Sequence, residues 1–227
     1  MAVTIASVRS SIKRLVLDGY YGDAEIDEWI DDAVKAVAGG ILMPDGDISP
    51  PLPDLYNIET VTTSTSSPYV DLPDDYQRGV FYISDSTGDR IHPVNGGDYY
   101  SFNLFLNNVI NKDLSTAGMI TSVCVRGLRL YYQGIPSAAT TLSVQYYREP
   151  DGIEGIPQHL AKHLLKHWVC KEIFSEGIED GRVNSGRGQE FHEKKFYEFM
   201  ETLRVFIGID AEPEYYGLAG HSTRSDW

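Results

Sequence analysis

Residues 157–174 read PQHLAKHLLKHWVCKEIF, and residues 190–208 read EFHEKKFYEFMETLRVFIG. In both segments apolar residues recur at steps of three and four, with charged residues between them, which marks one apolar stripe on an α-helix. Pro157 opens the first segment, where its missing amide hydrogen costs no hydrogen bond. Glycines and polar residues from Gly177 to Gly188 separate the segments. The sequence therefore predicts a helical hairpin over residues 157–208, whose stripes must pack against other parts of the chain.

The N-terminal part predicts two more amphipathic helices, over residues 4–17 and 23–41. The second has the more regular apolar stripe, formed by Ile26, Trp29, Ile30, Ala33, Val34, Val37 and Ile41. Four prolines then fall between Pro44 and Pro53. Prolines at this density end a periodic segment, so this part of the chain is expected to be a linker.

Between residues 56 and 150 the apolar period changes to two, and β-branched and turn-forming residues become frequent, which is typical of short β-strands. The predicted strands are Tyr56–Thr63, Tyr69–Leu72, Gly79–Ser84, Arg90–Val94, Met119–Val125, Leu128–Gln133 and Thr141–Arg148. Residues 98–110 break the alternation and predict a short helix. Gly134–Ser137 is predicted to join the last two strands as a hairpin.

The predicted order is therefore two helices, a β-rich block and two helices. Four helices with matching apolar stripes can share one core if the ends of the β-rich block lie close together. We thus expect an α+β fold with a four-helix bundle core, formed by residues 1–43 and 157–208. A β-rich insertion domain over residues 54–150 interrupts this core, and residues 209–227 follow as an extended C-terminal arm.

The arm has no periodicity. It nevertheless carries four large side chains of the kind that anchor protein interfaces, Tyr215, Tyr216, Leu218 and Trp227. Two interpretations remain open: the arm docks on another subunit, or it folds back on its own helices.

Composition restricts the function without identifying it. The 227 residues carry a formal net charge of −14, which argues against a protein that clamps nucleic acid, because that affinity comes from Lys and Arg. The charge is compatible with a protein that DNA passes without binding, since a negative channel wall repels phosphates. The alternative is that it only keeps the protein soluble.

The same composition gives expectations about membranes and cysteines. No apolar run approaches the roughly 18 residues of a membrane span, and the first residues lack the pattern of a secretion signal. Cys124 and Cys170 lie far apart in the sequence. We expect two buried thiols and no disulfide framework.

The histidines at positions 159, 163 and 167 follow one another at four-residue steps. Two histidines at this spacing can bind one metal ion, as in HExxH helices. Here the glutamate base is missing, and Lys162 and Lys166 would repel a cation. The sequence therefore predicts no metal site, and it places His159, His163 and His167 at a boundary between helices or between subunits.

Other candidate chemistry is equally weak. Asp31-Asp32 and Asp74-Asp75 are pairs of neighbouring carboxylates, which point apart on a helix or strand and so do not form an acid–base pair by themselves. The Gly-rich residues 184–189 precede a predicted helix and could cradle an anion, but they also fit an ordinary turn between helices. No nucleophile elbow, P-loop or dinucleotide motif occurs. We expect no enzyme activity and no cofactor.

Three phrases of the sequence resemble a known family when taken in order. Leu72-Pro73-Asp74-Asp75-Tyr76 is similar to the Leu-Pro-x-Asp-Tyr segment with which a strand ends in that family. Residues 123–132 are similar to its glycine-centred hairpin, and residues 142–150 to its Tyr-Tyr-x-x-Pro segment that leads into a helix. The helix that starts at Ile156-Pro157 and contains His163 and Trp168 also fits. Over about residues 56 to 208, the chain resembles the head-to-tail adaptor proteins of tailed bacteriophages, mainly podophage-like ones.

This resemblance implies a structural virion protein without enzyme activity. Such adaptors have a helical core and form a ring, commonly of twelve copies, between the portal and the tail. The partners implied are further copies of the chain, the portal protein, a downstream tail or nozzle protein, and DNA that passes through without specific binding. The implied location is the neck of the virion, after synthesis in the host cytoplasm. Tyr215, Tyr216, Leu218 and Trp227 then become candidate contacts to the portal or a neighbouring subunit.

Three alternatives remain open. The first is a tail-completion or tail-capping protein of the neck. The second is a carbohydrate- or partner-binding module that uses Tyr131, Tyr132, Tyr146 and Tyr147 to line a groove. The third is a metal hydrolase on the histidine-bearing helix.

Overall fold

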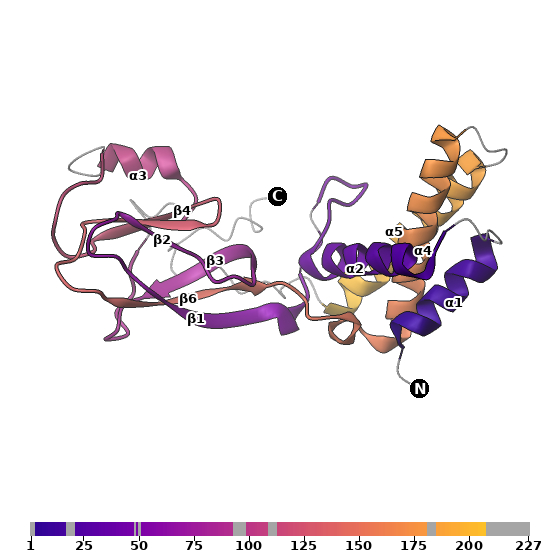
Figure 1. Cartoon of the computed structure of the whole chain (residues 1–227), viewed down its shortest axis with the longest axis horizontal. Helices are drawn as coiled ribbons and strands as arrows, with labels where there is room; N and C mark the ends of the chain where they lie inside the picture. The colour runs from indigo at the N-terminus through magenta and orange to yellow at the C-terminus, as the bar shows by residue number, and fades with distance from the viewer. Residues whose placement is uncertain are drawn as a thin grey trace. The chain divides into compact units, whose positions relative to one another are not determined.

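The computed structural model describes residues 3–16, 21–47, 49, 51–92, 99–108, 113–180 and 185–207. The chain divides into two compact units. The helical unit combines Met1–Leu55 with the segment that starts at Glu149, and the β unit is Tyr56–Arg148. Across the described residues there are five α-helices and two three-stranded antiparallel sheets (Figure 1), so the predicted α+β class is confirmed.

The helical unit is organised around α4, which runs over Gln158–Glu179. The helix α5, Ser185–Ile207, packs along it and forms the predicted hairpin. The N-terminal helices α1, Ile5–Val16, and α2, Asp23–Gly39, pack on each other and on α4. Thus α4 is the one described helix with extensive contacts to the other three.

The prediction of a four-helix bundle core is wrong. In such a bundle each helix forms one wall around a shared interior. Here Leu164 and Leu165 are both fully buried, as are Val169 and Cys170, although neighbouring residues on a helix point about 100° apart. Because α4 is covered on several sides, it is the centre of the unit, with α1 and α2 against it and α5 along it.

The linker after α2 is tied to α5 by one arginine. The Nη1 atom of Arg204 lies 2.9 Å from Asp45 Oδ2, and its Nη2 atom lies 2.7 Å from Asp47 Oδ2. One guanidinium thereby bridges two carboxylates of the same loop and ties that loop to α5.

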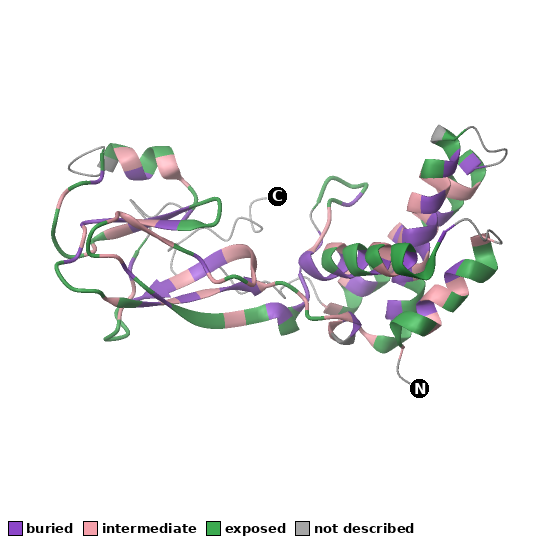
Figure 2. Ribbon diagram, in the orientation of Figure 1, coloured by how far each residue is buried: buried purple, intermediate pink, exposed green. Residues whose placement is uncertain are grey.

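The β unit contains two sheets with strand orders β1-β6-β3 and β2-β5-β4. The strands are β1 Tyr56–Thr62, β2 Tyr69–Asp71, β3 Tyr76–Ser84, β4 Ser122–Arg126, β5 Arg129–Gln133 and β6 Thr141–Arg148. One apolar core joins residues of both sheets and of the loops beside them, namely Val61, Leu72, Val80, Ile83, Ile91, Tyr99, Val123, Val125, Leu130, Tyr132, Leu142, Val144 and Tyr146. The edge strand β1 is mostly exposed (Figure 2).

A short helix, α3 (Phe102–Asn108), packs beside the second sheet. Phe105 is fully buried there against Cys124 and Leu114. The predicted helix over residues 98–110 is thus present, although shorter. It buries the apolar residues of β4 and β5 that do not face the main core.

Two strand predictions need correction. Arg90–Val94 forms no strand within the described residues, and Arg90 makes only an isolated bridge to Ser84. Gly134–Ser137 does not close a hairpin, because the strands on either side of it, β5 and β6, belong to different sheets. The hairpin joins β4 and β5 instead and turns at Gly127, whose φ of +60° lies in the region that favours glycine. Alternation predicts which residues are buried but not which sheet a strand joins.

Candidate interaction surface

The four anchor residues predicted in the C-terminal arm, Tyr215, Tyr216, Leu218 and Trp227, lie outside the described residues, as does the arm itself. Their contacts therefore stay a prediction. Within the described residues, the candidate surface is formed by α4 and α5.

The three predicted histidines of α4 lie against phenylalanines of α5. The ring centroids of His163 and Phe199 are 4.7 Å apart with the planes 18° from parallel, and those of His167 and Phe199 are 5.8 Å apart. His159 meets Phe206 edge-on at 5.2 Å. The histidines thus line one helix–helix boundary, and no group of three potential metal ligands occurs among the described residues.

His167 makes the most specific contact of this boundary. Its Nδ1 atom lies 2.8 Å from Nδ1 of His192, and both side chains are buried. A hydrogen bond between two imidazole nitrogens needs one donor and one acceptor, so one ring carries its proton on Nδ1 and the other on Nε2. His192 also stacks on Phe174, with centroids 5.4 Å apart.

The environment keeps this pair neutral. Burial, followed by the charge of Lys166, lowers the pKa of His167 to about 3 and that of His192 to about 4. At neutral pH the pair is therefore an uncharged polar contact inside an aromatic boundary. Sequence reasoning missed His192, because it occupies an ordinary position on the buried side of the second helix.

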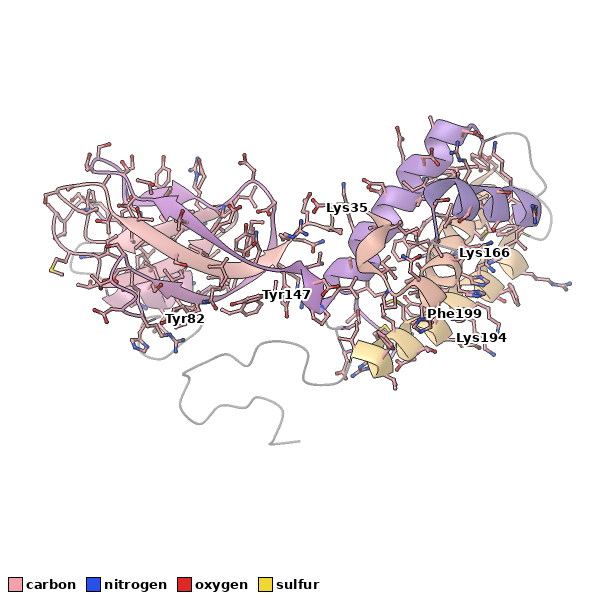
Figure 3. The ribbon with its side chains drawn as sticks, turned by 90° about the horizontal axis from the view of Figure 1, so that it is seen from below. Lys35, Tyr82, Tyr147, Lys166, Lys194 and Phe199 are labelled. Carbon is pink, nitrogen blue, oxygen red and sulfur yellow. The ribbon has the colours of Figure 1, made fainter. Side chains whose placement is uncertain are left out.

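Next to this buried pair, the hairpin leaves apolar side chains in solvent. Phe191 is 53% exposed, Phe206 61% and Val205 80%. Together with His159, His163 and Phe199 they form what we call the His–Phe face, part of which is labelled in Figure 3. Clustered exposed aromatic residues of this kind mark protein interaction sites.

Lysines surround the His–Phe face. The pKa of His163 is lowered by burial and then by the charges of Lys166 and Lys162. On α5, Lys195 pairs with Glu198 at 2.5 Å, and Lys194 adds to the lowering of the pKa of that carboxyl. Lys195 is thus neutralised by Glu198, and Lys162, Lys166 and Lys194 are the basic side chains that remain beside the face, although the whole chain carries a charge of −14.

The Gly-rich residues before α5 have a packing role. Ser185 already begins α5, so most of the segment predicted as a turn lies inside the helix. A Cβ atom on Gly188 would come within 2.6 Å of Cδ1 of Phe174. Glycine here lets the two helices approach closely, and this contact brings His192 beside His167.

The acidic pairs serve different purposes. Asp31 forms an ion pair with Lys35 of the same helix, at 3.1 Å. In the β unit, the Tyr146 hydroxyl donates a hydrogen bond to Asp75, and Asn57 Nδ2 lies 3.2 Å from the same hydroxyl. Burial, with the Asp75 carboxylate next, raises the pKa of Tyr146. Asp75 thus accepts the hydrogen bond of a buried tyrosine hydroxyl.

The other acidic pair, Asp31-Asp32, lines a shallow hollow on the exposed side of α2 together with neighbouring residues. It is lined by Ala24, Asp27, Glu28, Asp31 and Asp32. Figure 2 shows much of α2 as exposed.

The tyrosines proposed for a carbohydrate groove do not line one. Tyr132 and Tyr146 are fully buried and Tyr147 is 1% exposed. Tyr131 is half-buried and packs edge-on against Phe102 of α3, with centroids 5.1 Å apart. Three of the four rings therefore belong to the interior of the β unit.

Two further features concern the cysteines and the apolar content of the helices. Cys124 and Cys170 are both buried and form no disulfide with each other, as predicted, and burial raises the pKa of the Cys170 thiol to about 12. None of the described helices combines the length and the apolar content that crossing a membrane would require.

Comparison with known proteins identifies a family. The family model described as SU10 adaptor protein matches residues 3–217. No curated protein matches the chain.

Proposed function

The chain belongs to the SU10 adaptor protein family, and on this premise we propose that it forms a ring-shaped head-to-tail adaptor between the portal and the tail of a bacteriophage. The observation that carries the proposal is the extent of the match, because residues 3–217 include both the helical unit and the β unit. A structural adaptor of this kind acts through its surfaces and does not need a catalytic centre.

The His–Phe face supports assembly into a ring. A single copy leaves Phe191, Val205 and Phe206 largely in water. At about 25 cal/mol for each Å² of apolar surface removed from water, covering aromatic residues contributes substantially to association. A subunit that assembles into a ring has such a surface to cover.

The negative charge supports a passage for DNA through the ring. Since carboxylates repel phosphates, an acidic lumen would let DNA move without being held. This part of the proposal predicts that acidic side chains of the helical unit line the channel. A basic or neutral lumen in an assembled ring would refute it.

The C-terminal arm is proposed to hold the portal or a neighbouring subunit through Tyr215, Tyr216, Leu218 and Trp227. The test is a pull-down of the full chain with purified portal, compared with a chain that lacks residues 212–227. We expect portal capture by the full chain and its loss on truncation, with an unchanged circular dichroism spectrum. Equal capture by both chains would rule out the arm. In a parallel pull-down with purified tail protein, capture of that protein but not of portal would instead identify a tail-completion protein.

A further inference from the structure

We propose that the His–Phe face of one copy docks on the acidic side of α2 of the next copy, so that the ring is closed by head-to-tail contacts between unlike faces. The inference rests on the proposed ring and names the two surfaces that build it. Its occupant is a second copy of this chain.

The first surface is apolar at its centre and basic at its rim. Phe191, Val205 and Phe206 supply the exposed apolar area. Lys162 and Lys194 are exposed beside it. An apolar centre within a charged rim is the usual anatomy of a protein interface.

The second surface carries the opposite charge. Glu25, Glu28, Asp31 and Asp32 are all exposed on α2. Lys35 is the one lysine of that helix, and it is paired with Asp31. Glu28 and Asp32 have no ion pair among the described residues, and they line the same shallow hollow as Ala24.

Charge complementarity identifies the occupant. Each copy presents a basic apolar surface and an acidic surface, so identical chains can satisfy both without a third component. Surfaces of opposite charge steer association and suppress wrong pairings. A partner of another kind would leave one of these two surfaces without its complement.

The position of the two surfaces selects a ring over a twofold dimer. Figure 3 shows α2 and α5 on opposite sides of α4 within the helical unit, in agreement with the separate packing of each on α4. A contact between two different faces is heterologous, and it generates a closed ring when the rotation between copies closes.

The test uses charge reversal in the full chain at exposed positions. One double variant is Lys162→Glu with Lys194→Glu, and the other is Glu28→Lys with Asp32→Lys. Each variant leaves both surfaces with the same sign of charge. Each should therefore raise the concentration at which half of the protein is assembled at least tenfold. Native mass spectrometry measures that concentration, and circular dichroism melting checks the fold.

Two rescue experiments make the test specific. In a mixture of the two double variants, the unchanged basic face of the second can meet the unchanged acidic face of the first. The two altered faces also have opposite charges, because one has become acidic and the other basic. The mixture should therefore assemble with alternating copies, and a chain carrying all four changes should assemble alone. As a control, Glu59→Lys with Asp74→Lys changes the net charge as much as the second double variant, at exposed positions of the β unit, and should assemble normally.

The outcomes separate this inference from the proposed function. If the wild-type chain forms rings and both double variants do so equally, the ring stands and this contact is wrong. If assembly is lost and neither the mixture nor the fourfold variant restores it, the two faces do not meet. If the wild-type chain forms no ring, with or without portal, the proposed function fails and the inference fails with it.

Discussion

Lowering the pH from 7 to 5 should destabilise the helical unit through His167 and His192. Both side chains are buried, and their pKa values are about 3 and about 4 in the folded chain. An unfolded histidine has a pKa of about 6.5. As the pH falls from about 6.5 to about 4, the unfolded state takes up protons that the folded pair does not, so stability is lost with acidification.

The magnitude follows from proton linkage. At pH 5, an unfolded histidine with a pKa of about 6.5 gains about 2 kcal/mol relative to pH 7, and a folded one with a pKa below about 4 gains almost nothing. The two histidines therefore set an upper value of about 4 kcal/mol. Partial hydration of an imidazolium and relaxation of the hairpin reduce this loss, and we expect about 2 kcal/mol.

The assay is denaturant unfolding at pH values from 5 to 8, followed by tryptophan fluorescence. Trp29 and Trp168 both belong to the helical unit, and Trp227→Phe removes the third indole from the signal. The variant His192→Leu should lose about half of the pH dependence. It should also lose about 1–3 kcal/mol at pH 8, because His167 then lacks its partner. His159→Gln, at an exposed position, is the matched control.

The reasoning fails if the free energy of unfolding of the wild-type chain is the same at pH 5 and pH 7. It also fails if His192→Leu and His159→Gln show the same pH dependence. Carboxyls with lowered pKa values, such as Glu198, act at lower pH and do not explain a loss between pH 6.5 and 5. His163, whose pKa burial also lowers, adds to the loss in the wild-type chain and in His192→Leu alike, so the difference between these two chains measures the contribution of the pair.

Two further changes test the packing of each unit. Gly188→Ala places a Cβ atom within 2.6 Å of Phe174 and should cost about 1–3 kcal/mol of unfolding free energy. Gly186→Ala, where the nearest atom to the new Cβ is 4.0 Å away, should instead stabilise α5 by up to about 1 kcal/mol. Equal effects of the two substitutions would contradict the close approach of the helices at Gly188. Tyr146→Phe removes the hydroxyl that binds a carboxylate and should cost about 1–3 kcal/mol of unfolding free energy. Because Trp29 and Trp168 both belong to the helical unit, this loss is measured by amide hydrogen exchange of strand β6. A similar loss in Tyr82→Phe would show that the bond to the carboxylate is not the cause.

The sequence predicted the class of the fold and the positions of its main elements, because burial leaves a period in the chain. The stripe on residues 160–173 correctly indicated a packed helix. It did not show that Leu164 and Leu165 face different neighbours, and this is why the four-helix bundle was wrong. Periodicity reports that a residue is buried, and the partner that buries it depends on the topology.

The candidate surface was predictable only in part. The four-residue spacing of His159, His163 and His167 indicated a boundary, and the structure shows them against α5. Gly188 could not be recognised as a packing residue, because a glycine in a polar run usually marks a turn. The basic side chains beside the His–Phe face could not be predicted either, because the net charge of a chain does not show where its charged residues lie in the fold.

The central claim is that copies of this chain assemble into a ring. The most direct measurement is native mass spectrometry of the full chain, alone and with purified portal, combined with low-resolution imaging of the particles. The account predicts a closed assembly of many copies with an open centre, bound to the portal. A chain that remains a single copy under both conditions would contradict it.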